Sequence, residues 1–279
     1  MNVTIGISAY NEAQNIGNLL NFLRDYPFEK IVVASGCTDD TVKIAKSFSG
    51  VKVIVEEIRK GKASAVNEII HEAGGDIIIL EGADTIPSGF CFNYLLEPII
   101  NNPDIGMVGA HPIPVNKLDS QINKIGHLLW RSHHQMALKY PKAGEVIAFR
   151  NKISGIDPAT PVDEAYIEFE LVEMGYKVAY APDAIIFNRA PENRDDFIKQ
   201  RKRIFAGHLR LKEKGYQVHT MNTFEVIAAS WRASHNIFLL AQGGFLELRA
   251  RHEAVKSMKN GYNPTIWERV SSTKQVQNE

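Results

Sequence analysis

The chain contains little cysteine and no excess of charge of either sign. Its 279 residues include only two cysteines, Cys37 and Cys91, which are too few for a disulfide framework and are not spaced as metal ligands. This usage indicates a reducing, cytoplasmic setting. Lysine plus arginine number 32, as do aspartate plus glutamate, so the formal net charge is +0. A neutral chain lacks the basic surplus of nucleic-acid-binding proteins, and we expect no nucleic-acid partner.

Long apolar runs are also missing. No stretch reaches about 18 apolar residues, the length that a membrane-spanning helix needs. The nearest approach, residues 223–248, is interrupted by Arg232, His235 and Glu247. This segment is better suited to lie on a membrane, which leaves open a peripheral position at the inner membrane surface. The first residues, 1–5, lack the basic and apolar regions of a signal peptide and predict a strand.

The first half does contain a regular alternation of short apolar segments and helical patterns. Four segments are apolar on both faces, as buried parallel strands are. The predicted strands are 3–7, 30–34, 51–55 and 76–80, and the predicted helices are 12–26, 39–48 and 62–73. This order predicts βαβ units, a parallel sheet and a ligand site beyond the carboxyl ends of the strands.

The second half is less regular and richer in helix. The predicted strands are 106–110, 146–149, 177–180 and 184–187, and the predicted helices are 118–140, 165–174 and 195–214. The last of these helices is basic, and Gly215 is placed to end it. A chain of this length can bury one large core, so we expect a single α/β domain with appended helices. Residues 271–279 are polar and predict a disordered tail.

Two loops after predicted strands carry groups suited to a nucleotide. In the first, residues 8–12, Tyr10 can lie against a base and Glu12 can contact a ribose or base edge. A helix cap made by Asn11 explains the same loop without a ligand. In the second loop, Ser35 is followed by Gly36, which lets the backbone turn closely.

Two further loops carry charges suited to phosphate and metal. Lys62 follows Gly61 at a predicted helix start, where free N–H groups and positive charge favour an anion, although a solvated basic turn is the alternative. After strand 76–80 come two carboxylates, Glu81 and Asp84. Mg²⁺ and Mn²⁺ take oxygen ligands and often bridge one or two carboxylates to substrate phosphates. The alternative is that Asp84 only orders its turn.

In this order the loops resemble those of the inverting family 2 glycosyltransferases of the GT-A fold, and the resemblance covers residues 3–208. The matching motifs are Tyr10-Asn11-Glu12, Gly36-x-Thr38-Asp39, Gly61-Lys62-x-x-Ala65-x-Asn67, Asp84-Thr85 and Gly144-x-x-x-Ala148-Phe149-Arg150. Each motif is short, but their joint order is specific. The resemblance implies an α/β GT-A (Rossmann-like) fold, a mostly parallel sheet flanked by helices, with an added C-terminal helical segment.

The resemblance also implies a donor site at Ala9, Tyr10, Glu12, Ser35 and Lys62. At the end of the second strand, Ala34-Ser35 occupies the place of the family's acidic pair. Ser35 stands where the family carries a carboxylate and can offer only a hydroxyl.

At the metal motif Asp-x-Asp, Gly82 replaces the first aspartate, while Asp84 keeps the second. The resemblance therefore implies a Mg²⁺ or Mn²⁺ site at Asp84, with Glu81 as a substitute ligand. His208 is a further candidate ligand, although a lone histidine in a helix is more often not one.

An acidic pair supplies the candidate catalytic base. Asp163-Glu164 stands where the family has Glu-Asp, and Gly175 follows Glu164 by 11 residues, the family's usual offset. The resemblance makes Glu164 the base, with Asp163 beside it, and a carboxylate can take the proton of an acceptor hydroxyl. The alternative is that Asp163 caps a helix and Glu164 is a first-turn acid.

The basic helix supplies candidate contacts to a leaving diphosphate. Residues 200–204 resemble the family's Gln-x-x-Arg-Trp motif, with Ile204 in place of the tryptophan. Gln200 and Arg203 lie about one turn apart and face the same way, so both can reach a phosphate. A solvated basic face is the alternative.

These features predict a metal-assisted, inverting glycosyltransferase that takes a sugar from a nucleotide-diphosphate donor. The predicted acceptor is a hydroxyl or phosphate of a glycan, lipid-phosphate or small molecule. Residues 1–215 would form the catalytic domain, with the donor half at 1–110 and the acceptor half at 111–215, and residues 216–270 a helical appendage. The alternative, motivated by Ser35 and Gly82, is a protein that binds nucleotide sugar or glycan without turnover. A nucleotidyltransferase is disfavoured, because residues 8–12 hold no glycine-rich basic loop.

Overall fold

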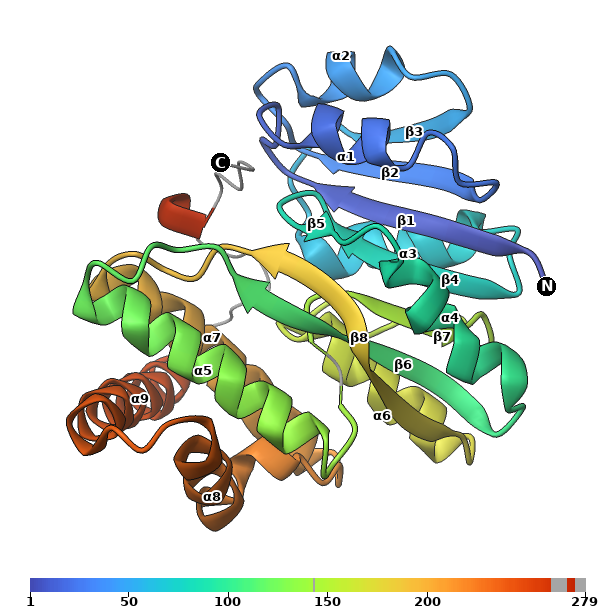
Figure 1. Cartoon of the computed structure of the whole chain (residues 1–279). Coiled ribbons are helices and arrows are strands. Elements are labelled where there is room, and N and C mark those ends of the chain that lie inside the picture. The colour runs from blue at the N-terminus through green and yellow to red at the C-terminus, as the bar shows by residue number, and fades with distance from the viewer. Residues whose placement is uncertain (143, 262–269, 274–279) are drawn as a thin grey trace.

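The computed structural model describes residues 1–142, 144–261 and 270–273, which form a mixed eight-stranded sheet with helices on both faces (Figure 1). The strands are β1 (Val3–Ala9), β2 (Glu29–Ser35), β3 (Val51–Glu56), β4 (Ile77–Gly82), β5 (Ile86–Pro87), β6 (Ile105–Pro114), β7 (Ile147–Arg150) and β8 (Lys177–Asn188). The helices are α1 (Ile16–Phe22), α2 (Thr41–Lys46), α3 (Lys62–Glu72), α4 (Cys91–Asn101), α5 (Gln121–Ala137), α6 (Asp163–Glu173), α7 (Arg194–Glu213), α8 (Thr223–Ala233) and α9 (Ile237–Lys259). Across the sheet the strands follow the order β3-β2-β1-β4-β7-β6-β8-β5.

The first half of the sheet is parallel, as predicted. β1 lies between β2 and β4, and β2 also pairs with β3, all in parallel register. These strands are apolar on both faces because helices cover the sheet on either side. The helices between them are shorter than predicted, and α1 begins at Ile16 because residues 10–15 form a loop at the end of β1.

The second half departs from a parallel sheet. β7 runs antiparallel to both β4 and β6, whereas β6 and β8 are parallel. The two strands predicted at 177–180 and 184–187 are one strand, because a shift in the register between β6 and β8 accommodates Pro182. The sequence did not predict α4, which holds Pro98 in its interior, where proline usually breaks a helix.

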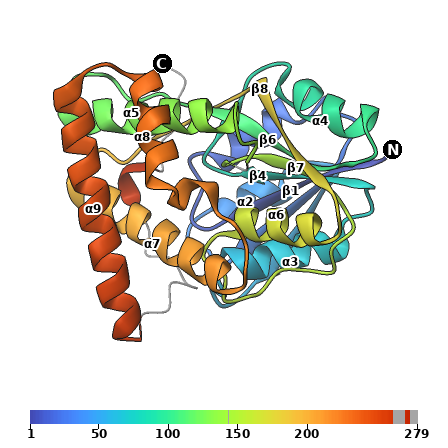
Figure 2. The ribbon, with the colours of Figure 1, turned by 90° about the horizontal axis from the view of Figure 1, so that it is seen from below.

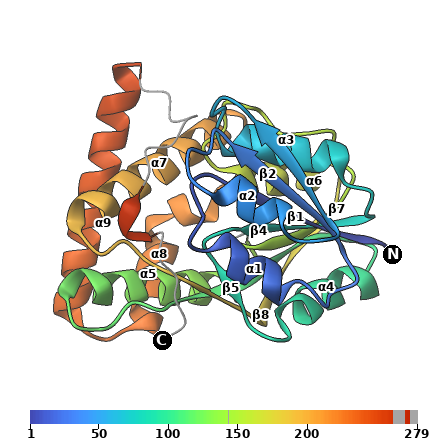
Figure 3. The same ribbon diagram turned by 90° about the horizontal axis from the view of Figure 1, so that it is seen from above.

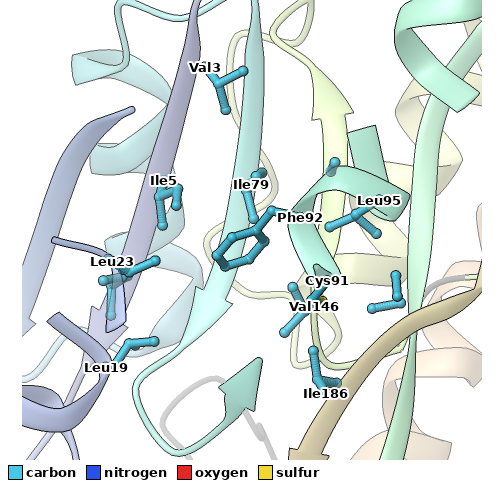
Figure 4. Packing of buried hydrophobic residues seen from close by; sticks show 14 of the residues in the cluster. Val3, Ile5, Leu19, Leu23, Ile79, Cys91, Phe92, Leu95, Val146 and Ile186 are labelled. Carbon is cyan, nitrogen blue, oxygen red and sulfur yellow. The ribbon is translucent and has the colours of Figure 1, made fainter. Parts of the chain in front are cut away.

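Two apolar cores lie on opposite faces of the sheet. One packs β1 and β4 against α1 and α4, with the fully buried ring of Phe92 close to Ile79 (Figure 4). The other packs the reverse side of the same strands against α3 and α6, including Ile69 and Ile167. Successive side chains of a strand point to opposite faces, so β4 sends Ile79 to the first core and Ile78 to the second.

Four helices gather at the end of the sheet that lies opposite the N-terminus. These are α5, α7, α8 and α9, which we call the helical group (Figure 2, Figure 3). α9 packs on α7 and α8 packs on α5, and the shared core includes Leu128, Phe197 and Leu246. α7 ends as predicted, because Gly215 adopts a positive φ of 95° just after it. Among the helices of the described residues, none combines the length and the apolar character that crossing a membrane requires.

Candidate active site

A cavity of about 660 Å³ lies where the carboxyl ends of the parallel strands face the helical group. Ten of the twelve predicted site residues are in its wall, and they come from both halves of the chain. They are Ala9, Tyr10, Glu12, Ser35, Lys62, Asp84, Glu164, Gln200, Arg203 and His208. Glu81 and Asp163 lie outside the wall, so the roles of these two acids differ from those of the rest.

Asn11 ties the first two loops together. It has a positive φ of 53°, which asparagine tolerates better than most residues, and its side chain accepts a hydrogen bond from the backbone N–H of Thr38 at 2.8 Å. The interpretation of Asn11 as a helix cap is therefore wrong, and α1 begins only after Asn15. The turn at Asn11 leaves Tyr10 and Glu12 in the cavity wall.

Hydrogen bonds and a cation–π contact among these loops fix the cavity wall around Tyr10. Glu12 is buried, and its carboxylate accepts a hydrogen bond from Asn15 at 2.8 Å. The hydroxyl of Ser35 accepts a hydrogen bond at 3.2 Å from a backbone N–H of the loop after β3. From that loop the guanidinium of Arg59 lies 3.8 Å from the ring centre of Tyr10, a cation–π contact. A base stacked on Tyr10 would share the ring with Arg59 or displace it.

Lys62 joins the two halves of the site. It is the first residue of α3, and its Nζ lies 2.8 Å from Asp163 and 2.7 Å from Glu164 at the start of α6. Gly61 before it has a φ of 103°, a backbone conformation that favours glycine. The predicted contact of Lys62 with the donor phosphates stays a prediction, and the structure adds that its ammonium pairs with the two predicted catalytic carboxylates.

These three charges set one another's protonation. Burial opposes the charge on Lys62, but both carboxylates raise the pKa of its ammonium above the usual range. Burial and the charge of Glu164 raise the pKa of Asp163 to about 6. Burial alone would raise the pKa of Glu164 as well, but the charge and the hydrogen bond of Lys62 lower that pKa below its ordinary value. Glu164 is therefore ionised at neutral pH, and it is the member of the pair that lines the cavity.

The start of α6 shows that Asp163 is not a helix cap. The cap position is Val162, whose side chain makes no capping hydrogen bond, and Asp163 is already the first residue of the helix. α7 passes so close that a Cβ added at Gly207 would come within 2.7 Å of Val162. The interpretation of Asp163 as a cap is wrong, and its buried carboxylate instead supports Lys62 from outside the cavity wall.

Glu81, predicted as a metal ligand, is buried and lies apart from the cavity wall that Asp84 lines. It is 1 % exposed and lies outside the cavity wall, within electrostatic reach of Cys91 on α4. The hydroxyl of Thr85 is hydrogen-bonded both to the Glu81 carboxyl and to the carbonyl of Gly82, the latter at 2.8 Å. A hydroxyl has one hydrogen and a carbonyl cannot donate, so a proton on Glu81 satisfies both bonds. Burial accordingly raises the pKa of Glu81 to about 8.

Glu145 is a carboxylate of the site that the sequence did not predict. It precedes β7, lines the cavity and has a positive φ of 57°. Burial and the charges of Asp84 and Glu164 raise the pKa of Glu145 to about 7. Asn188 of β8 donates a hydrogen bond to it at 3.4 Å. Because a left-handed backbone is uncommon for glutamate, no local pattern in the sequence could have indicated where this side chain points.

His208 lines the cavity but lies among cations. Burial and the charges of Lys142, Arg201 and Arg251 lower the pKa of His208 to about 3. Neutral imidazole can bind a metal, but three neighbouring cations disfavour a divalent ion at this position. The structure therefore does not support the predicted metal role of His208. Within residues 1–142, 144–261 and 270–273, no group of three or more His, Cys, Asp or Glu side chains forms a metal site by itself.

Gln200 and Arg203 lie in the cavity wall on α7. The helix is capped by Asn193, which accepts a hydrogen bond from the backbone N–H of Asp196 at 2.8 Å. Amide and guanidinium donors of α7 thus share one cavity with the carboxylate of Glu164.

Glu81→Gln should stabilise the protein in a pH-dependent way. In the unfolded chain Glu81 ionises near its ordinary pKa of 4.5, whereas its pKa in the folded state is about 8. Between these values the unfolded state releases a proton that the folded state keeps, so the free energy of unfolding falls as the pH rises. The glutamine avoids this loss, and its advantage should grow to on the order of a few kcal/mol near pH 8. Urea unfolding across this pH range, with EDTA present, measures it.

The matched control for this experiment is Glu57→Gln, because Glu57 is exposed in the loop after β3. Its free energy of unfolding should follow the pH dependence of the native protein. If the advantage of Glu81→Gln were the same at both ends of the pH range, Glu81 would not be protonated in the folded state.

Relatives of the chain are found at the level of sequence. The family described as glycosyl transferase family 2 matches residues 4–150. The poly-beta-1,6-N-acetyl-D-glucosamine synthase of Staphylococcus aureus is 26 % identical over 261 residues, which cover 82 % of this chain and 62 % of that protein. The synthase of the same name from Staphylococcus epidermidis is 25 % identical over 72 % of this chain and 53 % of its own length. The chain therefore spans less than two thirds of these relatives.

Solved structures share the fold. A mannosyltransferase from Pyrobaculum calidifontis, in complex with GDP-Man and Mn²⁺, has a TM-score of 0.61 at 21 % identity and covers 94 % of this chain and 81 % of its own. The glucosyl-3-phosphoglycerate synthase of Mycobacterium tuberculosis, in complex with Mn²⁺, UDP and phosphoglyceric acid, has a TM-score of 0.56 at 17 % identity, covering 75 % and 78 %. From the match over residues 4–150 and the shared architecture, the chain belongs to glycosyl transferase family 2 and has the GT-A fold.

Proposed function

We propose that the protein transfers a sugar from a nucleotide-diphosphate donor to an acceptor, with inversion at the anomeric carbon. The observation that carries the proposal is the position of Glu164, an ionised carboxylate held by Lys62 in the wall of the cavity that Asp84 also lines. A structural relative in complex with GDP-Man and Mn²⁺ supports a sugar nucleotide as the donor.

Glu164 acts as the general base in this reaction. The acceptor oxygen attacks the anomeric carbon, and its proton passes to the carboxylate of Glu164. The bond from the anomeric carbon to the diphosphate breaks on the opposite face, and its electron pair leaves with the diphosphate, so the configuration inverts. Asp163 is a positioning residue, because it holds Lys62 and Lys62 in turn orients Glu164.

The donor nucleoside binds at the loops after β1 and β2. Tyr10 offers its ring to the base, while Glu12 and Ser35 offer oxygens to the base or the ribose. Ala9, with no side chain beyond Cβ, leaves room beside them.

The diphosphate binds toward α7. Gln200 and Arg203 donate hydrogen bonds to it, which matters because its negative charge grows as the glycosidic bond breaks. An arriving diphosphate also competes with Glu164 for the ammonium of Lys62. The donor thereby loosens the ion pair between Lys62 and Glu164.

The acidic side of the cavity fits a divalent metal ion. Asp84 and Glu145 both line it, and their charges interact. Two carboxylates suit Mg²⁺ or Mn²⁺, which complete their oxygen ligands with substrate phosphates and water. When bound, such an ion offsets negative charge on the leaving diphosphate. Glu145 would then serve as the metal ligand in place of the aspartate that is absent at Gly82. The sequence had predicted this ligand role for Glu81.

Glu164→Gln should slow transfer while leaving donor binding in place. The amide keeps the shape of the side chain but cannot accept the proton, so kcat should fall about 10²- to 10⁴-fold. Release of nucleoside diphosphate from UDP- and GDP-sugars with Mn²⁺ measures the rate. The thermal shift caused by the same nucleotides measures binding.

Glu173→Gln is the control for this variant, because Glu173 is exposed at the end of the same helix. It should retain the native rate. Equal and low turnover in the native protein and in Glu164→Gln would favour the alternative, a protein that binds nucleotide sugar or glycan without turnover.

Asp84→Asn and Glu145→Gln should each weaken Mn²⁺ binding by about tenfold or more, because each removes one of the two carboxylates proposed to hold the ion. Electron paramagnetic resonance of Mn²⁺ in the presence of UDP measures this without turnover. Glu81→Gln is the isosteric control and should bind Mn²⁺ as the native protein does. Loss of binding in Glu81→Gln together with native binding in Glu145→Gln would return the metal role to Glu81.

An exposed apolar stripe on α8 and α9 supports a peripheral contact with a membrane. The stripe consists of Phe224, Phe238 and Phe245, which are 85 %, 83 % and 67 % exposed. The exposed cations Arg232 and Arg249 lie on the same two helices. Aromatic side chains flanked by cations suit the interface of a bilayer with anionic lipids. Such a contact would place the reaction at the cytoplasmic face of the membrane.

Phe238→Glu should weaken binding to anionic liposomes by about tenfold or more, because it puts a charge where an apolar ring would be buried. Co-sedimentation at two salt concentrations measures this, and the native binding should fall as salt rises. The control is Phe90→Glu, since Phe90 is 71 % exposed but lies at the start of α4. A native protein that does not sediment with liposomes would rule the contact out.

A further inference from the structure

The cavity continues past the catalytic carboxylates into the helical group. Its wall there consists of apolar side chains of α5, α8 and α9, among them Leu128, Met136, Ala229 and Leu240. We call this part of the cavity the apolar arm. A small polar acceptor would leave the apolar arm in contact with water, whereas a hydrocarbon chain would cover it.

A group of cations lines the same cavity as the catalytic carboxylate. This cation group consists of Lys142, Arg201 and Arg251, all in the cavity wall. Its three members lie close enough to His208 to lower its pKa. Lys142 also interacts with Glu168, which lies four residues and about one helical turn beyond Glu164 on α6. One member of the cation group is therefore near the helix that carries the base.

Carboxylates lie near the cation group. Arg201 pairs with Glu247 of α9 at 2.5 Å, and Glu168 accepts a hydrogen bond from the hydroxyl of Tyr216. Burial, reinforced by the charge of Arg201, lowers the pKa of Lys142 to about 8. Glu247 and Glu168 thus lie near the three cations, and a phosphate would add negative charge where the cations gather.

The apolar arm opens onto the outer surface of α8 and α9. Ile227, Trp231 and Leu248 line the cavity, yet they are 61 %, 49 % and 67 % exposed. The same helices carry the exposed apolar stripe. A chain in the apolar arm can therefore pass directly into a lipid surface.

We propose that the acceptor is a membrane lipid in which a phosphate joins a long hydrocarbon chain to a hydroxyl-bearing head group. The chain occupies the apolar arm, the phosphate lies at Lys142 and Arg251, and the head group presents its hydroxyl to Glu164. This inference rests on the proposed transferase function and narrows the acceptor to one chemical class.

The transfer step needs no further reactant. The head-group oxygen forms the new bond to the anomeric carbon and gives its proton to Glu164. The bond between that carbon and the nucleoside diphosphate breaks, and its electron pair leaves with the diphosphate. The lipid phosphate forms and breaks no covalent bond. The cation group holds it in place, and this fixes how far the head group lies from Glu164.

Farnesyl phosphate, which has a chain and a phosphate but no sugar, tests the inference by binding alone. Trp130 and Trp231 line the cavity, so a change in tryptophan fluorescence reports occupation. We expect farnesyl phosphate to bind about tenfold or more tightly than either farnesol, which lacks the phosphate, or inorganic phosphate, which lacks the hydrocarbon chain. Equal binding of farnesyl phosphate and either reference compound would overturn the inference.

Gly244 offers a variant that obstructs the apolar arm without harming the helix. It lines the cavity on α9, and an added Cβ meets nothing within 4 Å. Gly244→Leu adds bulk there and also raises helix propensity, so the fold should be kept. Farnesyl phosphate should bind Gly244→Leu about tenfold more weakly than it binds the native protein or Gly244→Ala. Native binding in Gly244→Leu would overturn the placement of the chain.

Lys142→Ala should remove the preference for farnesyl phosphate over farnesol. Lys256→Ala is the control, because Lys256 is exposed on α9 and lies outside the cavity wall. It should keep the native preference. A Lys142→Ala protein that also keeps the preference would overturn the placement of the phosphate.

Donor binding separates this inference from the proposed function. The thermal shift caused by UDP- and GDP-sugars should be the same in Gly244→Leu as in the native protein. If donors bind but farnesyl phosphate does not, the lipid acceptor is overturned and the transferase proposal stands. Farnesyl phosphate could instead bind, with weaker binding in Gly244→Leu and a lost preference in Lys142→Ala, while no donor binds. The transferase proposal then fails and the lipid site stands.

Discussion

The contact of Lys62 with Asp163 and Glu164 holds the site together. It links the start of α3 to the start of α6 across 102 residues of chain. The three charges depend on one another: Asp163 is buried and Lys62 and Glu164 are partly buried, so removing Lys62 would leave the buried charge of Asp163 uncompensated. Gly61 allows the turn that begins α3, and Gly207 lets α7 approach the turn before α6. Glu164, the proposed base, is thus positioned by an ion pair that forms only when both halves of the sheet have assembled.

Charge also divides the cavity into two regions with different chemistry. Asp84, Glu145 and Glu164 make one region acidic, and the cation group around His208 makes another basic. The proposed divalent ion and the proposed acceptor phosphate would therefore have separate places in one cavity. The family's metal motif has lost one aspartate in sequence, but a carboxylate from the turn before β7 stands in the same cavity.

Much of the architecture could be predicted because its signals are local. Apolar segments of strand length predicted β1 to β4, and the rule that ligands bind beyond the carboxyl ends of parallel strands brought their loops together correctly. The failures occurred where tertiary packing overrides local preference. α4 contains Pro98, β8 runs through Pro182, and β7 is antiparallel to its neighbours, none of which a short-range pattern indicates.

By itself, the sequence determined the strands of the donor half, the loops that follow them and the set of polar residues available to the site. Apolar periodicity, glycine positions and motif spacing act over a few residues, so a single chain displays them. Only the tertiary structure decided which of those residues meet. Lys62 pairs with Asp163 and Glu164, Glu81 is buried with a raised pKa, and Glu145 lines the cavity. None of this is visible in the sequence, because ion pairing, burial and protonation depend on neighbours that are distant in the sequence.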